Sequence, residues 1–506
     1  MAELVSRAAA RLPDQAAIVD VTSGITLTWA DLDAAVSAEA NRLRGAGVQP
    51  GDRVVIRLAN GAGFCVTLLG ALRAGAIAVP YGPIAVAREL GIVFDDCRPK
   101  VVVAAEGDDS ATAPATAVGA SMIAPPDLAA RSEDRQDGVG GGEDIALLIY
   151  TSGTTGSPRG VQLSHRAVLA NREQAAALRP APVTSVDRVL LALPLFHSFG
   201  LAAGLLQVCW AGATVVLTEH FGPRHLAEVL IEQRVSGIAG VPSMFRALLD
   251  LPPDELRAAT AGLRLCTSGG APLPARWLAD FREATGLSIF EGYGLTEGGP
   301  VLTTNPFGRD PKPGSVGRAL PGIELRLVDS EGHPLEAPEP DPDDVDEDVF
   351  DPTHDTGLVA VRGPNLFSGY WPDGAGGPDA DGWFRTADVG FLDADGDLFL
   401  VDRSSDLVIV NGFNVYPREV EQVLCELHGV ADAAVVGIPD ERAGEAVKAV
   451  LVLEEGVELG REEIIAHCSA RLARFKVPSV VEIVDALPRT PTGKVARRQL
   501  AGQESA

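Results

Sequence analysis

Short apolar segments alternate with helix-like segments through most of this 506-residue chain, and this alternation constrains the fold more than any other feature. The apolar segments include "RVVIRL", "VVVAA", "IALLIYTS", "RVLLALP", "TVVLT" and "LRLCTSGG". Between them lie stretches rich in Ala, Leu and Arg with helical spacing, such as "RHLAEVLIEQRV". Uninterrupted apolar strands are typical of parallel sheets that helices cover on both faces. The sequence therefore predicts an α/β fold with mixed and parallel sheets.

The length of the chain predicts at least two domains, because a single hydrophobic core rarely grows this large. The pattern changes at a polar break, residues 403–406, where "VDRSSDLVIV" interrupts two apolar segments. We therefore predict a large N-terminal domain at 1–402, a hinge at 403–406 and a second domain at 407–506. The second domain, with a helix that begins near Pro417, reads as a small α+β unit of roughly 100 residues.

Charge and cysteine usage exclude several classes of function. The formal charge of −27 repels a phosphate backbone and an anionic membrane, so no nucleic-acid partner is expected. The six cysteines form no CxxC pair, which indicates a reducing compartment and no zinc framework. The first 15 residues contain an acid and no uninterrupted apolar core, so we expect no secretory signal and a cytoplasmic protein.

The most apolar segment, residues 200–217, is long enough to suggest a membrane span. Its interior "WAGA" breaks the pattern, however, and "TVVL" is β-branched. A buried helix, a glycine turn and a short buried strand fit better, so no membrane span is expected.

Two acidic segments raise the question of calcium binding. Residues 336–355 carry ten acids and no Lys or Arg, but they lack a turn glycine and an ordered ligand spacing. A solvated acidic loop is the preferred interpretation. In "DADGD", residues 393–397, the glycine falls too early for an EF-hand loop, and a hairpin turn explains it.

The loop "YTSGTTGSPRG", residues 150–160, follows an apolar strand and offers five Ser/Thr hydroxyls and three glycines. Such a turn presents hydroxyl and backbone N–H donors to polyphosphate oxygens, although turns of this composition are also common without a ligand. It lacks the GxxxxGK[ST] pattern of a Walker loop, and its basic residue, Arg159, lies beyond the glycines. The loop alone leaves both readings open.

Further motifs follow in a fixed order: "LPLFHSFG", "GVPSMF", "TSGGAPL", "EGYGLTE", "GWFRTADVGFLDADGDLFLVDRSSDLVIVNGFNVYPREVE" and "LPRTPTGK". Together with the loop above they closely resemble the adenylate-forming superfamily of acyl-CoA synthetases, peptide-synthetase adenylation domains and firefly luciferase. The resemblance spans essentially the whole chain. It implies that ATP binds between the large N-terminal domain and a small mobile C-terminal lid that turns about the hinge. The hinge here carries Ser404 and Ser405 in place of the usual charged pair.

The resemblance implies a role for each matching residue of the ATP site. The β- and γ-phosphates would lie against Thr151, Ser152, Gly153, Thr154, Thr155 and Gly156, with the charge of Arg159 nearby. The nucleotide would be enclosed by Gly270, Ala271, Pro272, Glu291, Gly292, Tyr293 and Gly294, with Tyr293 stacking on adenine. Thr296 would touch the α-phosphate, Glu297 would hold Mg²⁺, and Asp388 would bind the ribose hydroxyls.

Lys494 is the implied central catalytic residue, together with Thr296, Glu297 and Arg403. An anionic carboxylate must attack an anionic phosphate, so a cation that neutralises both lowers the barrier. In isolation, a lysine in "PTGK" reads as a solvated turn residue; its place in this order of motifs favours catalysis. Arg403 would contact the ribose or a phosphate at the domain junction.

The acyl substrate and its acceptor are narrowed by two segments. Amino-acid-activating members carry an aspartate after the "LPLFH"-like segment, whereas residues 197–199 are His-Ser-Phe, so a non-amino carboxylic acid is favoured. His197 and Val241 would line the acyl pocket, although His197 also fits as an ordinary core histidine. "NGFNVYP" resembles the coenzyme A loop of acyl-CoA ligases, with Gly412 as the close-approach glycine.

The sequence thus predicts an ATP- and Mg²⁺-dependent acyl-CoA synthetase acting on a fatty acid or similar hydrophobic carboxylate. An acyl-AMP ligase that loads a carrier protein is the nearest alternative. Such ligases usually carry an insertion after the "GYW" motif, and the segment "GYWPDGAGGPDADGWFRTAD" is short, which favours coenzyme A. A non-catalytic nucleotide-binding protein is the distant alternative, suggested only by the hinge serines and Arg159.

Overall fold

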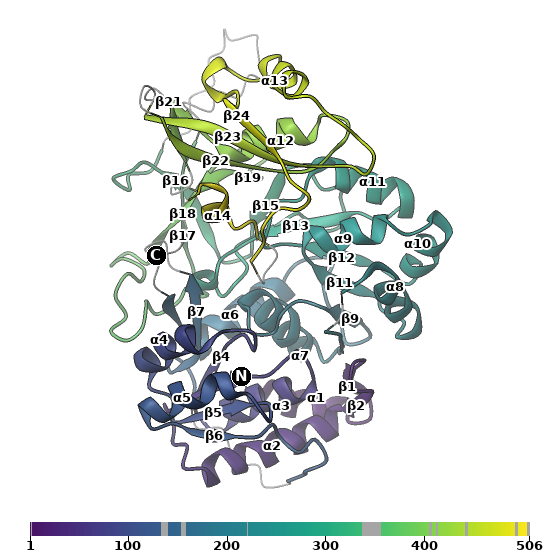
Figure 1. Cartoon of the computed structure of the whole chain (residues 1–506). Coiled ribbons are helices and arrows are strands. Elements are labelled where there is room, and N and C mark those ends of the chain that lie inside the picture. Colours follow the sequence, from purple (N-terminus) through teal and green to yellow (C-terminus); the bar gives the residue numbers. More distant parts are fainter. Residues whose placement is uncertain are drawn as a thin grey trace.

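Three β-sheets organise the residues that the computed structural model describes (Figure 1). These residues are 1, 3–132, 140–152, 158–219, 221–335, 356–403, 407–410, 413–440, 444–490 and 494–502. The acidic segment 336–355 and the hinge serines lie outside them.

The six-stranded sheet has helices on both faces. Its order is β6-β5-β3-β4-β7-β8, and its neighbours are parallel except for β7 and β8. Side chains alternate along β3: Val54 and Ile56 pack in the core that holds α2 and α3, and Val55 packs in the core that holds α4 and α5. This double burial explains why the strand sequences are continuously apolar. The strands are β3 (Arg53–Arg57), β4 (Ile77–Pro80), β5 (Val101–Ala104), β6 (Ser121–Ile123), β7 (Ile145–Ser152) and β8 (Pro158–Ser164), and the helices are α2 (Trp29–Gly45), α3 (Ala62–Arg73), α4 (Ala87–Cys97), α5 (Asp109–Val118) and α6 (His165–Ala176).

The thirteen-stranded sheet combines a parallel half with an antiparallel half. Its order is β16-β17-β18-β19-β15-β14-β13-β12-β11-β9-β10-β1-β2. From β1 to β13 the neighbours are parallel, and from β13 to β16 they are antiparallel. The predicted α/β class with mixed and parallel sheets is confirmed. The strands are β1 (Ala16–Asp20), β2 (Ile25–Thr28), β9 (Arg188–Leu191), β10 (Thr214–Leu217), β11 (Gly237–Gly240), β12 (Leu265–Ser268), β13 (Ile289–Tyr293), β14 (Thr303–Thr304), β15 (Ser315–Ala319), β16 (Glu324–Val328), β17 (Gly357–Arg362), β18 (Trp383–Leu392) and β19 (Leu398–Arg403).

The apolar segment 200–217 forms a buried helical stretch, a glycine turn and a strand, as predicted. A π-helix, η1 (Phe199–Leu206), continues into α7 (Gln207–Ala211), and Gly212 then turns the chain with a φ of 70° into β10. In the described residues no helix combines the length and the apolar character that crossing a membrane requires. The other helices of this part are α1 (Glu3–Arg11), α8 (Pro223–Glu232), α9 (Pro242–Leu249), α10 (Pro253–Thr260), α11 (Ala275–Thr285) and the short 3₁₀ helix η2 (Thr296–Gly298).

The C-terminal part forms its own sheet at the top of Figure 1, above β13 and β15. Its strand order is β21-β20-β23-β22, with β24 parallel to β23, and its helix α12 begins at Pro417 as predicted. β19 belongs to the large sheet and β20 to this one, while the exact boundary at 403–406 stays a prediction. The elements are β20 (Val408–Val410), β21 (Phe413–Val415), α12 (Pro417–Cys425), β22 (Val430–Asp440), β23 (Gly444–Leu453), α13 (Arg461–Ser469), the 3₁₀ turn η3 (Arg474–Lys476), β24 (Val480–Ile483) and α14 (Arg497–Leu500).

Two smaller features of the sequence have clear places in the fold, and the second was predicted. Five of the six cysteines are buried and Cys425 is half-buried, so they serve as small packing residues. The "DADGD" segment is the turn of the β18–β19 hairpin, in which the Gly396 N–H donates to the carbonyl of Asp393 at 2.8 Å.

Candidate active site

A cavity of about 980 Å³ lies where the carboxyl ends of the parallel strands meet the C-terminal part. Strands β7, β12 and β13 end at its wall, residues 237–239 of β11 also line it, and the side chains of Thr490 and Lys494 complete it from the C-terminal side. Crevices outside the carboxyl ends of parallel strands are the usual ligand sites of open α/β sheets. The described residues that line it and were predicted from the sequence are Thr151, Arg159, His197, Gly270, Gly292, Tyr293, Gly294, Thr296, Glu297, Asp388 and Lys494.

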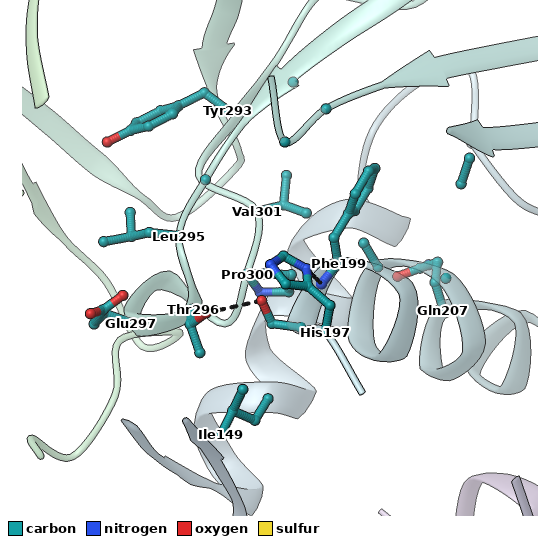
Figure 2. A pocket seen from close by; sticks show the side chains of 18 of the residues that line it. Ile149, His197, Phe199, Gln207, Tyr293, Leu295, Thr296, Glu297, Pro300 and Val301 are labelled. Atoms are coloured by element: carbon teal, nitrogen blue, oxygen red, sulfur yellow. Dashed lines mark hydrogen bonds between the residues drawn. The ribbon is translucent and has the colours of Figure 1, made fainter. Parts of the chain in front are cut away.

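The tight turn after β13 places Thr296 and Glu297 in the cavity wall. A side chain at Gly294 would bring a Cβ within 1.8 Å of the Pro300 carbonyl oxygen, so only glycine fits this turn. The Thr296 hydroxyl lies 3.1 Å from the hydroxyl of Ser198, as the dashed line in Figure 2 shows. This contact joins the turn to the start of η1.

Tyr293 and Asp388 come from different strands and meet at one hydrogen bond. The Tyr293 hydroxyl donates to Asp388 Oδ2 at 2.7 Å. The N–H of Asp388 in turn donates to the Thr386 hydroxyl at 3.2 Å, and Asp388 faces Arg403 in the β18–β19 register. The hydrogen bond fixes both the ring and the carboxylate, so the two predicted nucleotide contacts are oriented together.

Tyr370 connects Arg159 to Glu297. Its hydroxyl donates to Glu297 Oε1 at 2.7 Å, and the Arg159 guanidinium carbon lies 3.5 Å from the centre of its ring. Burial first, and the negative charge of Glu297 second, raise the pKa of Tyr370, so the hydroxyl keeps its proton and remains a donor. In the sequence the "GYW" motif served only as a landmark, so this role of Tyr370 was not predicted.

His197 lies in the middle of the cavity wall, between Thr296 and Phe199 (Figure 2). The Phe199 N–H donates to His197 Nδ1 at 3.3 Å, which places the proton of the neutral ring on Nε2. Burial first, and the charge of Lys494 second, lower the pKa of His197 to about 4. At neutral pH the ring is therefore an uncharged donor near the ammonium group of Lys494.

Four predicted residues do not line this cavity. Val241 precedes α9, Ala271 and Pro272 follow the Gly270 turn, and Glu291 is buried behind the wall. Glu291 Oε1 accepts the N–H of Leu273 at 3.1 Å, and burial raises its pKa to about 8. Glu291 thus positions the turn after β12.

Some predicted residues lie outside what the structure describes. Gly153, Thr154, Thr155, Gly156 and Gly412 are not described, and only the backbone of Ser152 and Arg403 is.

Most of the chain matches two known protein-family models. The model of the AMP-binding enzyme family matches residues 5–371, and that of the AMP-binding enzyme C-terminal domain matches residues 419–494. The chain belongs to the AMP-binding enzyme family. The predicted resemblance to the adenylate-forming superfamily is therefore confirmed.

Relatives of this AMP-binding enzyme are similar over nearly their whole length. A long-chain-fatty-acid–CoA ligase of Yersinia pestis is 33% identical, with 99% of this chain and 94% of the relative covered. A feruloyl-CoA synthase of Amycolatopsis sp is 35% identical, with 94% of each covered. A crystal structure of ATP-bound MatB from Rhodopseudomonas palustris superimposes with a TM-score of 0.89 at 31% identity, covering 99% of this chain and 98% of that one.

The family implies a magnesium ion, and Glu297 fits one. It supplies a half-buried carboxylate in the same wall as Thr296, and Mg²⁺ is commonly held by one or two carboxylates together with substrate phosphates. A second acidic group, Asp393, Asp395 and Asp397, has carboxylate oxygens within 4.8 Å of one another. The Lys312 ammonium lies 2.5, 2.6 and 3.0 Å from these three carboxylates, and Arg309 and Arg318 also bind Asp397, so cations of the protein itself balance this group.

Proposed function

We propose that this AMP-binding enzyme is an acid–thiol ligase that activates a non-amino, fatty or similarly hydrophobic carboxylic acid with ATP and transfers the acyl group to coenzyme A. The observation that carries the proposal is the meeting of Lys494 with Thr296, Glu297 and His197 in one cavity. Lys494 comes from the part that matches the C-terminal domain model and the other three from the part that matches the main model. The two curated relatives described above are named as a long-chain-fatty-acid–CoA ligase and a feruloyl-CoA synthase, and these names support the same reaction class.

In the first step a carboxylate oxygen of the acid attacks the α-phosphorus of ATP, and the bond to pyrophosphate breaks. Both reactants are anions, so the Lys494 ammonium lowers the barrier by neutralising the charge that they bring together. Thr296 donates from the side of the turn, and His197 Nε2–H donates without adding a second positive charge. Bound Mg²⁺, held by Glu297, would supply charge neutralisation for the phosphate oxygens.

The nucleotide would be held by contacts on two strands. Asp388 accepts hydrogen bonds from the ribose hydroxyls, while Tyr293 fixes its carboxylate and offers a ring to the adenine. Arg159, held over the Tyr370 ring, adds positive charge near Thr151, where the predicted phosphate loop begins. Pyrophosphate is the leaving group, so this part of the wall positions ATP and Lys494 activates it.

In the second step the thiol of coenzyme A attacks the acyl carbon, AMP leaves, and the thiol proton passes to solvent. The lid would turn about residues 403–406 between the two steps, which brings the loop around Gly412 to the cavity. We also propose that the two domains that move relative to each other span residues 1–402 and 407–506. We place the enzyme in the cytoplasm, where reduced cysteines, ATP and coenzyme A coexist.

Purified full-length protein with ATP, MgCl₂, coenzyme A and a panel of fatty and aryl acids tests the proposal. AMP and an acyl-CoA thioester should form together, as mass spectrometry detects. Lys494→Ala should abolish AMP formation, and Lys100→Ala, an exposed lysine outside the cavity wall, should retain it. Absence of AMP with every acid would contradict the proposal. If the acyl-adenylate forms but transfers its acyl group only to a carrier protein, the acceptor is that carrier protein and not coenzyme A.

A further inference from the structure

Three buried polar atoms in the cavity wall have no hydrogen-bond partner among the described residues: Arg172 Nε, Gln207 Nε2 and Ser268 Oγ. The same condition holds in the described chain for atoms of Trp29 and Arg326, whose side chains are not part of this wall. Buried polar atoms are nearly always paired. Their concentration in one cavity indicates that a bound molecule meets them there.

Arg172 is the charged member of this group. It lies on α6, and its residue is only 1% exposed. Nη1 donates to Gln207 Oε1 at 3.2 Å, and Nη2 donates to the Gly299 carbonyl at 3.3 Å and to the side-chain oxygen of Asn171. All three acceptors are neutral, and within the described part of the chain no carboxylate forms an ion pair with Arg172.

The carboxylates in the cavity wall are bound to other donors. Glu89 accepts the N–H of Val86 at 3.1 Å, at the start of α4. Glu297 accepts the hydroxyl of Tyr370, and the Asp388 carboxylate accepts the hydroxyl of Tyr293. Among the described residues none of these three carboxylates forms an ion pair with Arg172, so its guanidinium has no direct counterion in the wall.

This charge persists at neutral pH. Burial lowers the pKa of Arg172 to about 9, which leaves the guanidinium protonated at pH 7. A buried cation without a counterion is unfavourable, and water can satisfy an N–H donor but does not neutralise the charge. A carboxylate does both, and a guanidinium binds it with two parallel hydrogen bonds.

The unpartnered atoms also indicate which chemical group would bind them, because donors require an acceptor. Arg172 Nε and Gln207 Nε2 are donors only, and a hydroxyl can donate as well. Figure 2 shows Gln207 and Glu297 on opposite sides of His197. Because Arg172 donates to Gln207, its guanidinium lies beside Gln207, and it also reaches the carbonyl of Gly299. An acid that reacts near Thr296 and Lys494 would extend toward it.

We propose that the acid activated by this enzyme carries a second carboxylate, which Arg172 binds in the cavity with Gln207, its hydrogen-bonded neighbour, as a second donor. This inference rests on the proposed function and narrows its hydrophobic acid to one whose apolar chain also carries a second carboxylate. One carboxylate reacts with ATP, and the other serves only for recognition.

A competition assay with the full-length wild-type enzyme tests this directly. Monocarboxylic acids and α,ω-dicarboxylic acids of equal carbon number, from four to twelve carbons, are offered in pairs with ATP, MgCl₂ and coenzyme A. We expect a dicarboxylic acid at one length to exceed its monocarboxylic partner at least tenfold in kcat/KM, because a site built for a polar group rejects analogues that lack it. The monomethyl ester of that diacid should behave like the monocarboxylic acid.

Variants of Arg172 separate recognition of the second carboxylate from support of the turn at Gly299. Arg172→Met should reverse the preference between the paired acids, and Arg172→Lys should restore part of it. Arg179→Met is the matched control, because Arg179 is exposed and, in the part of the chain that the structure describes, its guanidinium binds backbone carbonyls just before it. If Arg172 only braces Gly299, Arg172→Met lowers the rates with both acids by the same factor, and the inference is wrong. The wild-type competition decides even if Arg172→Met fails to fold.

The outcomes distinguish this inference from the proposed function. Faster turnover of the monocarboxylic acid at every length overturns the second carboxylate and leaves the ligase reaction standing. No AMP from any acid of either series overturns the proposed function itself.

Discussion

The hydroxyl of Tyr370 donates a 2.7 Å hydrogen bond to the carboxylate of Glu297. The same ring carries the Arg159 guanidinium on its face, 3.5 Å from the ring centre. A cation that follows the predicted phosphate loop and a carboxylate that fits Mg²⁺ are thus held by one side chain. Tyr370 acts as a positioning residue for both.

Tyr370→Phe should raise the Mg²⁺ concentration needed for half-maximal adenylation about tenfold, because it removes a hydrogen bond to a charged group but keeps the ring under Arg159. Tyr370→Leu should also raise the KM for ATP, since Arg159 loses its aromatic support. Pyrophosphate release measured at varied magnesium gives the first effect, and pyrophosphate release measured at varied ATP gives the second. Identical magnesium curves for wild type and Tyr370→Phe would contradict the role given to this hydroxyl.

Lys494→Ala should lower the rate of pyrophosphate release at least about 100-fold, because it removes the charge that joins acid and α-phosphate. Arg159→Ala should act mainly on the KM for ATP, by about tenfold, and Arg159→Lys should act less, because the positive charge remains. Steady-state kinetics at varied ATP separate the two parameters. Equal losses of kcat at positions 494 and 159 would show that the division of roles is wrong.

His197 should make the enzyme less stable in mild acid. Its folded pKa of about 4 lies below the ordinary value of 6.5, so the unfolded chain binds more protons between these values. The free energy of unfolding contributed by this group is fully present above pH 6.5 and decreases as the pH falls toward 4, by about 1–3 kcal/mol. Urea unfolding at pH 7 and pH 4.5 measures this loss. His197→Gln, which cannot be protonated, should lose less stability than wild type over the same interval.

Glu291 should have the opposite dependence. Burial raises its pKa from 4.5 to about 8, so the folded chain binds more protons than the unfolded chain between these values, and stability decreases as the pH rises through them. Glu291→Gln resembles the protonated carboxyl and can still accept the N–H of Leu273. We expect the variant to lose less stability than wild type between pH 5 and pH 8 in urea unfolding. Parallel curves for the two proteins would argue against a protonated Glu291.

The acidic hairpin turn should not bind calcium while Lys312 is present. The ammonium group contacts Asp393, Asp395 and Asp397, and hydrogen bonds to these carboxylates raise its pKa. Addition of Ca²⁺ should therefore leave the melting temperature of the wild type unchanged. Lys312→Met removes the cation that contacts all three carboxylates, while Arg309 and Arg318 still bind Asp397, so this variant should be less stable without calcium and should recover stability when calcium is added. A calcium-dependent rise in the wild type would contradict the role of Lys312.

The sequence predicted the architecture well where local pattern determines structure. Continuous apolar segments gave buried strands, Gly212 ended the helical stretch before β10, and Pro417 began α12. The order of the motifs also predicted that Lys494 and Thr296 line the same cavity. These features depend on backbone preferences and on the order of elements, which a single sequence records.

Side-chain direction was harder to predict. In β13, Phe290 and Gly292 line the cavity while Glu291 between them does not, because successive side chains point to opposite faces of a strand. Tyr370 was missed because its partners, Arg159 and Glu297, are distant in the sequence. Arg172 had a usable signal: it lies four residues after Val168 and three before Ala175, on the buried stripe of α6.

The cavity wall joins residues as distant in the chain as Pro80 and Lys494. During protein synthesis these two positions emerge roughly 400 residues apart, which at ribosomal rates of about 5–20 residues per second corresponds to about 20–80 s. Apart from Thr490 and Lys494, the residues that line the cavity are thus made well before the lysine. Translation itself delays the first adenylation until nearly all of this span has been made.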